Sequence, residues 1–180
     1  DERQVSEIAE TIAVNLAAPM LLAHALLPGM IARGRGHVVN IASVAGLIAV
    51  PFNEPYSATK FGLVGFSRSL RMTALASGWP VGISVICPGF IDGAGMFETL
   101  KREHGVSSEA MGATDLSALG QAVIDVIEQN LPDAIVTPVD IREFVAGSIM
   151  APSEFEKAAI HAPSSTMFRD VAAARKQPAN

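Results

Sequence analysis

Apolar residues along this chain fall into short β-branched runs that alternate with longer helical stretches. Three runs predict buried strands at residues 37–43 (HVVNIAS), 81–87 (VGISVIC) and 134–139 (AIVTPV). Helices are predicted over residues 4–33 and 53–77, and again from Asp115 onward. In this last helix one face carries Leu116, Leu119, Val123 and Ile127.

The connecting segments carry capping and turn signals. Asn53, followed by Pro55, and Asp115 are typical N-cap residues at the starts of their helices. The Gly-rich segment 90–113 is predicted to be flexible. The tail is predicted to be helical at first and then loose over about residues 163–180.

The alternation of helix and strand predicts an α/β fold. Such an order implies a parallel sheet with helices on its faces, and right-handed crossovers place the strands side by side in chain order. The first predicted element is a helix with no strand before it. We therefore expect residues 1–180 to form a single partial domain: the C-terminal part of a Rossmann-like, doubly wound parallel sheet, with about three strands and flanking helices.

Residues 11–32 contain no Asp, Glu, Lys or Arg, and a stretch of about 20 apolar residues is long enough to span a bilayer. Polar or helix-disturbing residues interrupt it, however, at Asn15, Pro19, His24 and Pro28. Its apolar residues fit a helix buried on most sides; they are Val14, Leu16, Met20, Leu21, Leu27 and Ile31. We interpret the stretch as a core or subunit-interface helix rather than a membrane span.

Composition narrows the classes of function. Apolar residues make up 49% of the chain and charged residues 17%, which excludes a disordered polypeptide. The net charge of -5 disfavours nucleic acid and anionic membrane surfaces as partners. Cys87 is the only cysteine, so we expect a buried thiol, no internal disulfide and a cytoplasmic location. No metal site is expected, because the histidines lack metal-ligand spacing; they are His24, His37, His104 and His161.

Candidate chemistry centres on Tyr56 and Lys60, which lie four residues apart and share one helix face. Their helix begins near Asn53, so the positive end of its dipole lies close to Tyr56. Two positive fields predict a lowered pKa for Tyr56, which would make it a general acid or base near neutral pH. Taken alone, such a pair is more often an ordinary surface pair.

Ser43 ends a predicted strand thirteen residues before Tyr56. Open α/β sheets bind ligands at the carboxyl ends of their strands, where a hydroxyl is able to hydrogen-bond a substrate oxygen. A serine in this place is also a common strand-end cap. The loop that follows is apolar (Val44, Leu47, Ile48, Val50 and Phe52), and core packing and a substrate wall explain it equally well.

Taken together, these motifs resemble the short-chain dehydrogenase/reductase family. The matching elements are Asn15 in VNL, Ser43 in NIASVAG, Tyr56 and Lys60 in YSATK, and Pro88–Gly89 in CPG, in the family's order and spacing. The resemblance implies that Tyr56 transfers a proton to or from the substrate oxygen, which Ser43 holds. It implies that Lys60 lowers the Tyr56 pKa and binds the nicotinamide ribose, and that Asn15 sits in a helix kink and orders a relay water.

The resemblance implies NAD or NADP as cofactor and a small-molecule alcohol or carbonyl compound as substrate. Tyr56, Lys60, Pro88, Gly89 and Ile91 are the expected cofactor-binding residues. The family usually has a threonine where this chain has Gly93, which leaves the backbone near Ile91 for that contact. The TGxxxGxG loop and the NNAG stretch of the family do not occur here. We therefore expect an N-terminally truncated member, inactive as this chain alone.

Other functions remain open. The chain is either the catalytic part of an oxidoreductase or a non-catalytic, truncated paralogue that acts as an oligomerisation or interaction module. An epimerase or dehydratase shares the Tyr and Lys, but the tail after Val139 is short for the sugar-binding region of such enzymes. In the family the helices at 4–33 and 53–77 often pack against a second subunit, so a homo-oligomer is expected.

Overall fold

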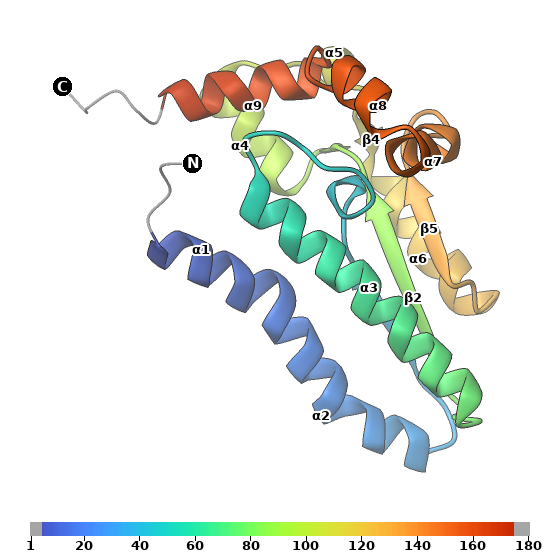
Figure 1. Ribbon diagram of the computed structural model, residues 1–180. Coiled ribbons are helices and arrows are strands. Elements are labelled where there is room, and N and C mark those ends of the chain that lie inside the picture. The colour runs from blue at the N-terminus through green and yellow to red at the C-terminus, as the bar shows by residue number, and fades with distance from the viewer. Residues whose placement is uncertain (1–4, 175–180) are drawn as a thin grey trace.

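The computed structural model describes residues 5–174 and has an α/β architecture (Figure 1). Its main sheet has three parallel strands in the order β1 (His37–Ile41), β2 (Gly82–Pro88) and β5 (Asp133–Val136). The parallel pairing and the side-by-side order confirm the predicted Rossmann-like arrangement. Two strands are shorter than predicted: β1 ends before Ser43, and β5 ends before Pro138.

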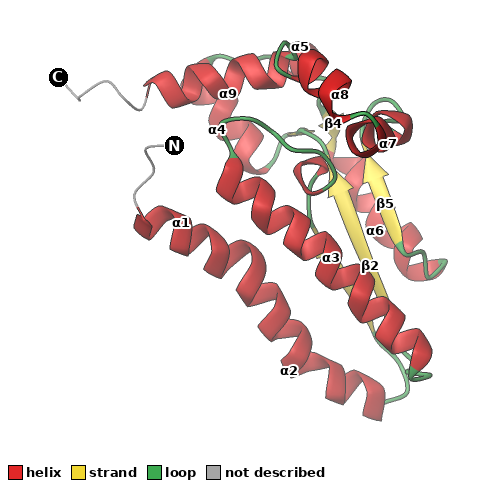
Figure 2. Ribbon diagram, viewed as in Figure 1, coloured by secondary structure: helices red, strands yellow, loops and turns green. Residues whose placement is uncertain are grey.

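Helices cover both faces of this sheet (Figure 2). Helix α3 (Glu54–Ala76) packs on the face to which Ile83 and Val85 of β2 point, and α6 (Leu116–Glu128) packs on the opposite face. The alternation of side chains along β2 therefore places every second residue in each half of the core. All of β2 is buried, as expected for a central parallel strand.

The first helical stretch bends at a π-helical turn. It consists of α1 (Val5–Ile12), the π-turn η1 (Ala13–Ala17) and α2 (Ala18–Ala32), which run alongside α3 in Figure 1. In α2 only Ala23 and Leu27 are buried. By length and composition the whole stretch would also be able to cross a membrane, a test that core helices and signal sequences pass as well.

The predicted burial of this stretch on most sides is therefore wrong for the chain as described. Val14 is 61% exposed and Leu21 68% exposed. The physical reason is that the helix contacts its neighbours along one narrow strip, mainly against α3 and β1. An apolar sequence without periodicity predicts a helix with few charged side chains, but it does not show which of its sides other elements cover.

Segment 90–113 is ordered into regular elements, so the prediction of a flexible segment is wrong. Its elements, with the strand that follows, are β3 (Ile91–Asp92), α4 (Gly95–His104), α5 (Ser108–Met111) and β4 (Thr114–Asp115). Phe97 and Leu100 are buried on one side of α4. The glycines form the ends of elements: Gly105 ends α4 with a left-handed conformation, at φ 64°.

The C-terminal part forms α7 (Arg142–Met150), α8 (Pro152–Ala159) and α9 (Pro163–Ala174). The loose tail predicted from residue 163 is therefore wrong as far as residue 174, and residues 175–180 lie outside the described part. Burial holds α9 in place, since Ser165 and Met167 are 4% and 6% exposed. Helices α7, α8 and α9 gather beyond the carboxyl ends of β2 and β5 (Figure 1).

The two predicted caps differ in outcome. The Asp115 carboxylate accepts the Ser117 N–H at 2.7 Å, which confirms it as the N-cap of α6. Asn53 stands at the N-cap position of α3, but its side chain makes no capping hydrogen bond. Instead, Glu54 in the first turn turns back and accepts the N–H of Phe52 at 3.1 Å.

Candidate active site

The candidate site lies where β1 and β2 end side by side. Ser43 follows β1, and its Oγ donates to the carbonyl oxygen of Pro88, the last residue of β2, at 3.4 Å. The same Oγ accepts the Ala45 N–H at 3.1 Å and so begins the 3₁₀ turn η2 (Val44–Gly46). Ser43 thus acts as a strand-end cap, and this role also fixes its hydroxyl at the carboxyl end of the sheet.

Turn η2 packs closely against α3. A Cβ added at Gly46 would lie 2.6 Å from the carbonyl oxygen of Lys60, nearer than real Cβ atoms approach. Only a residue without a side chain allows this contact. The glycine therefore sets how near the helix that carries Tyr56 and Lys60 comes to Ser43.

Tyr56 lies in the first turn of α3 and is half-buried. Burial raises the pKa of Tyr56 above its usual value, and a hydrogen bond with the Ser43 side chain lowers it in part. The prediction of a lowered pKa is therefore wrong for this chain. Desolvation of the phenolate outweighs the favourable contact, so Tyr56 is protonated at neutral pH.

Lys60 lies one turn after Tyr56 and points to the end of β1. Its Nζ donates to the carbonyl oxygen of Ile41 at 3.1 Å and lies 5.5 Å from the centroid of the Tyr56 ring. Burial lowers the pKa of Lys60, an effect that Cys87 partly offsets. The ammonium thus faces the ring and the strand end, and burial of the phenol is the main influence on the Tyr56 pKa.

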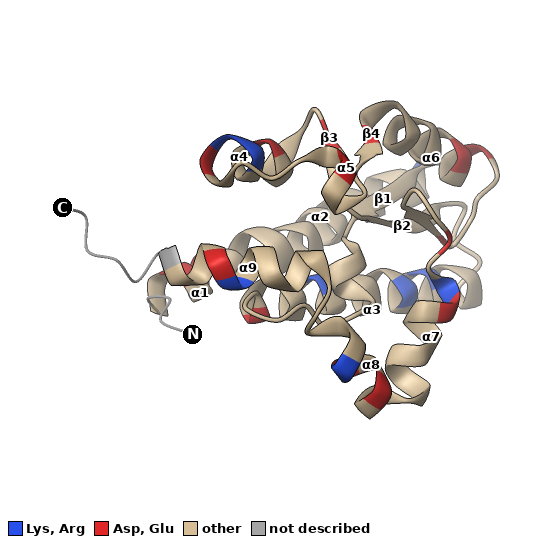
Figure 3. Cartoon of the chain, turned by 90° about the horizontal axis from the view of Figure 1, so that it is seen from above, with Lys and Arg blue, Asp and Glu red and all other residues tan. Residues whose placement is uncertain are grey.

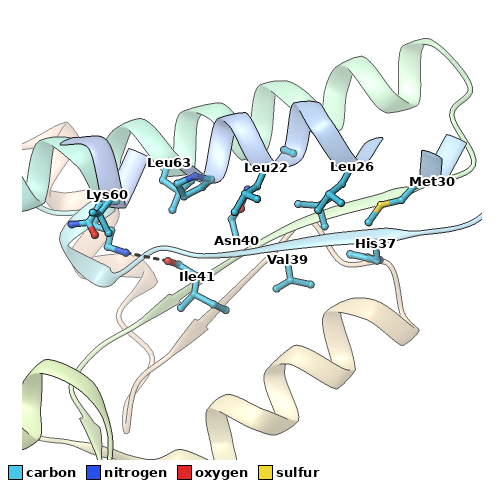
Figure 4. A pocket seen from close by; sticks show the side chains of 14 residues that line it. Leu22, Leu26, Met30, His37, Val39, Asn40, Ile41, Lys60 and Leu63 are labelled. Atoms are coloured by element: carbon cyan, nitrogen blue, oxygen red, sulfur yellow. Dashed lines mark hydrogen bonds between the residues drawn. The ribbon is translucent and has the colours of Figure 1, made fainter. Parts of the chain in front are cut away.

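Asn15 lies in the π-turn η1, an irregular helical turn of the kind that the resemblance implies for it. It lines a groove of about 470 Å³ together with Lys60, between α2 and the outer edge of β1. Figure 4 shows Leu22, Leu26 and Met30 on the helix side of this groove and the β1 side chains across from them. The groove is therefore largely apolar, with Lys60 at one end.

The expected cofactor-binding residues follow β2 in a continuous path. Pro88 is buried, and the Gly89 N–H donates to the carbonyl of Val136 at 3.0 Å, which ties the turn to β5. Ile91 is 8% exposed, and its side chain packs in the core with Val126. The Ile91 side chain is therefore turned inward, and only its backbone is placed to meet a ligand.

A family model for the short chain dehydrogenases matches residues 1–105, the part that contains Asn15, Ser43, Tyr56, Lys60 and Pro88–Gly89. This chain belongs to the short-chain dehydrogenase family.

Curated relatives of this short-chain dehydrogenase agree with the assignment. It is 35% identical over 148 residues to the ketoacyl reductase HetN of Nostoc sp., which covers 82% of this chain and 50% of HetN. It is 41% identical over 88 residues to human 17-beta-hydroxysteroid dehydrogenase 13, covering 48% of this chain and 29% of the relative. The chain spans about half the length of HetN, and its match to 17-beta-hydroxysteroid dehydrogenase 13 covers less of that relative.

Solved structures show the fold of this short-chain dehydrogenase. An actinorhodin polyketide ketoreductase variant with NADPH matches with a TM-score of 0.65 at 24% identity, covering 75% of this chain and 59% of that chain. A 4-hydroxyisoleucine dehydrogenase mutant complexed with NADH and succinate matches with the same TM-score at 22% identity and the same coverage. Both likenesses are likenesses of fold.

The site residues of this short-chain dehydrogenase fit the nicotinamide half of a dinucleotide. Lys60, Tyr56 and the Pro88–Gly89 turn converge at the carboxyl end of the sheet, where a nicotinamide and its ribose would contact them. The glycines Gly34 and Gly36 lie before β1, at the opposite end of the sheet, and Gly36 accepts the Gly82 N–H there. The turn formed by Gly34 and Gly36 therefore lies at the wrong end of the sheet to hold the pyrophosphate.

Sequence reasoning missed two features near the site. One is the Ile41 carbonyl as the partner of Lys60, for which no sequence signal exists. The other is a cluster formed by Asp92, Glu98 and Lys101 just beyond the Pro88–Gly89 turn. The i,i+3 spacing of Glu98 and Lys101 signalled a helix in a segment that the glycines made look flexible.

Proposed function

We propose that this chain carries the catalytic part of an NAD(P)-dependent oxidoreductase that interconverts an alcohol and a ketone or aldehyde. The observation that carries the proposal is the grouping of Ser43, Tyr56 and Lys60 at the carboxyl end of the sheet. The nicotinamide cofactors in the matched structures support NAD or NADP, without favouring either one.

In this proposal Tyr56 is the acid and base of the reaction. A bound, reduced nicotinamide would supply the hydride for the carbon of a carbonyl compound, and the Tyr56 hydroxyl would give its proton to the oxygen of that compound. The raised pKa of Tyr56 keeps that proton on the phenol at neutral pH. The Ser43 hydroxyl donates to the same substrate oxygen as negative charge develops there.

Lys60 and Asn15 complete the proposed set. After proton transfer the Tyr56 phenolate lies one helical turn from the Lys60 ammonium, whose charge stabilises it. Asn15 lines the same groove as Lys60, so a water held there would connect Lys60 to solvent for proton return. Tyr56, Lys60, Pro88, Gly89 and the Ile91 backbone are the proposed cofactor contacts.

We further propose that the 180 residues are inactive by themselves. The TGxxxGxG loop that holds the pyrophosphate in this family does not occur in residues 1–180. The nicotinamide end alone offers few contacts, which come from Tyr56, Lys60, the Pro88–Gly89 turn and the Ile91 backbone. A fluorescence titration with NADH and with NADPH tests this proposal: we expect no saturable change, and saturable binding of either cofactor would overturn it.

The proposed partners are a small-molecule alcohol or carbonyl substrate and further copies of this chain, in the cytoplasm, with neither nucleic acid nor membrane. Exposed apolar residues on α2 and α3, such as Leu21, Leu22 and Met72 at 60–70% exposure, support a homo-oligomer. Light scattering at micromolar concentration tests this assembly, and a monomer would contradict it. The same exposed residues favour the second candidate function, a non-catalytic oligomerisation module.

A chimera tests the catalytic proposal. The 148-residue stretch of HetN that matches this chain is replaced by the corresponding residues of this chain, and NADH- or NADPH-dependent reduction of a ketoacyl substrate is measured. We expect turnover with one cofactor. A folded chimera that binds cofactor but reduces no carbonyl compound would favour the non-catalytic module.

A further inference from the structure

Three charged side chains meet just beyond the Pro88–Gly89 turn. Nζ of Lys101 on α4 lies 2.5 Å from the Asp92 carboxylate of β3 and 2.5 Å from the Glu98 carboxylate on its own helix. Glu98 also accepts the N–H of Gly93 at 2.8 Å. Figure 3 shows the acidic and basic residues side by side on α4. Lys101 thus connects α4 to β3 and to the turn that follows it.

Aromatic contacts also hold the segment between Phe90 and Lys101. Nζ of Lys101 lies 5.6 Å from the ring centroid of Phe97, which is 3% exposed. The Phe97 ring packs against Phe90 with 5.1 Å between centroids. Phe90 directly follows Gly89, so the ion pairs and the aromatic pair hold the two ends of one short segment.

The position of Asp92 explains why a cation is needed there. Strands β3 and β4 pair in parallel, and the Asp92 and Asp115 Cα atoms are partners in that register. Two carboxylates side by side on neighbouring strands repel each other. Hydrogen bonds from Lys101 and Ser108 lower the pKa of Asp92, so its carboxylate is ionised and attracts the ammonium. Lys101 offsets part of this repulsion between the two strands.

We propose that Lys101 is a positioning residue that holds the backbone from Ile91 to Gly93 beside the nicotinamide ring. It acts through Asp92, which adjoins Ile91, and through Glu98, which holds the Gly93 N–H. The inference rests on the proposed function, because that function places the nicotinamide at the Ile91 backbone. Helix α4 thereby takes a role in cofactor affinity, although the contacts of Lys101 are with Asp92, Glu98 and Phe97 and not with the catalytic side chains.

Amide hydrogen exchange of the full 180-residue chain tests the positioning itself. Lys101→Met removes the charge and keeps the length of the side chain, and Arg102→Met is the matched control. Arg102 is the next residue of the helix, is 72% exposed and pairs only with its neighbour Glu103 among the described residues. We expect Lys101→Met to speed exchange of the Gly93 amide about three- to fivefold, the range for a partly exposed charge network, and Lys101→Arg to restore it. Equal exchange in the Lys101→Met and Arg102→Met variants would overturn the inference.

Kinetics of the HetN chimera test the consequence for the cofactor. We expect Lys101→Met to raise the KM for the cofactor about three- to fivefold while kcat changes less than about twofold, and Arg102→Met to change neither. Faster Gly93 exchange with an unchanged KM would overturn the positioning role. A chimera without any turnover would count against the proposed function, and the exchange measurement would still decide whether Lys101 fixes the segment.

Discussion

Lys60 of α3 donates a hydrogen bond from Nζ to the backbone carbonyl of Ile41 at 3.1 Å, and so joins the second turn of the helix to the end of β1. The same ammonium lies over the Tyr56 ring. One side chain therefore links the strand after which Ser43 stands to the helix that presents Tyr56. The relative position of the three residues depends on how closely η2 and α3 pack.

Replacing Gly46 tests that packing. In Gly46→Ala the new Cβ would meet the Lys60 carbonyl oxygen at 2.6 Å, so the backbone of η2 or of α3 would have to shift. We expect a loss of about 1–3 kcal/mol in the free energy of unfolding, measured with urea. Gly65→Ala on α3 is the control, because nothing lies within 4 Å of its Cβ position. It should be neutral or stabilise the chain by up to about 1 kcal/mol. Equal effects of the two substitutions would show that the close approach is unimportant.

The ionisation of Tyr56 is directly measurable, because it is the only tyrosine of the chain. We expect ultraviolet absorbance to report a pKa above the usual value of about 10, since burial raises it. Ser43→Ala removes the hydrogen bond that lowers the pKa and should raise it further. An apparent pKa below 10, or a fall on Ser43→Ala, would contradict the described surroundings of the phenol.

The same shift sets the behaviour of the chain in alkali. A folded-state pKa above the unfolded value means that the folded chain holds the proton more tightly at high pH. Stability from this group is therefore complete below about pH 10 and is lost as the pH rises through the folded-state pKa.

We expect His37 to make the stability of the folded chain depend on pH below neutrality. Ser84 Oγ donates to the Leu131 carbonyl, so it accepts the Nε2–H of His37, at 2.7 Å. Burial, and then the charge of Arg71, lower the pKa of His37. The unfolded chain therefore binds the proton more readily, and stability should fall as the pH drops below about 6.5.

The urea midpoint at pH 5 and at pH 7.5 checks this dependence. In the His37→Gln variant the side chain keeps a hydrogen-bond donor but does not titrate, so the difference between the two midpoints should shrink. A difference as large in the variant as in the original chain would assign the pH dependence to other groups.

Arg71 holds the end of α3 to the sheet and to the turn after α6. Its guanidinium donates to the Ile83 carbonyl at 2.8 Å and to the Asn130 side-chain and backbone oxygens at 2.9 and 2.7 Å. Lysine lacks the planar fork for three such bonds, so Arg71→Lys should cost about 1–3 kcal/mol of unfolding free energy. Arg68→Lys, three residues earlier in an exposed ion pair with Asp133, should cost less than about 1 kcal/mol. The opposite ranking in urea unfolding would contradict this assignment.

The sequence predicted the sheet well, because its signals are local. Three β-branched runs became three parallel strands in the expected order, and Asp115 caps α6 as its position predicted. The errors lie where the outcome depends on distant neighbours. The glycines in residues 90–113 favoured the prediction of a flexible segment. Phe97 and Leu100 are nevertheless buried there, because the fold brings distant residues against them.

The candidate site shows the same limit. The spacing of Tyr56 and Lys60 predicted one shared helix face, which the structure confirms. The predicted direction of the Tyr56 pKa was wrong, because burial of the phenol arises from tertiary packing and outweighs the hydrogen bond with Ser43. Spacing places charges along a helix but does not measure how much water surrounds them.

The most direct test of the account is the rate of the HetN chimera with Tyr56→Phe. The variant keeps the ring and the Lys60 contact, and loses the hydroxyl, with its hydrogen bond to Ser43 and the proton that the proposed mechanism transfers. We predict that kcat falls about 10²–10⁴-fold, a far larger effect than any change in the affinity for the cofactor. A kcat within a few-fold of the unsubstituted chimera would contradict the assignment of Tyr56 as the acid and base of the site.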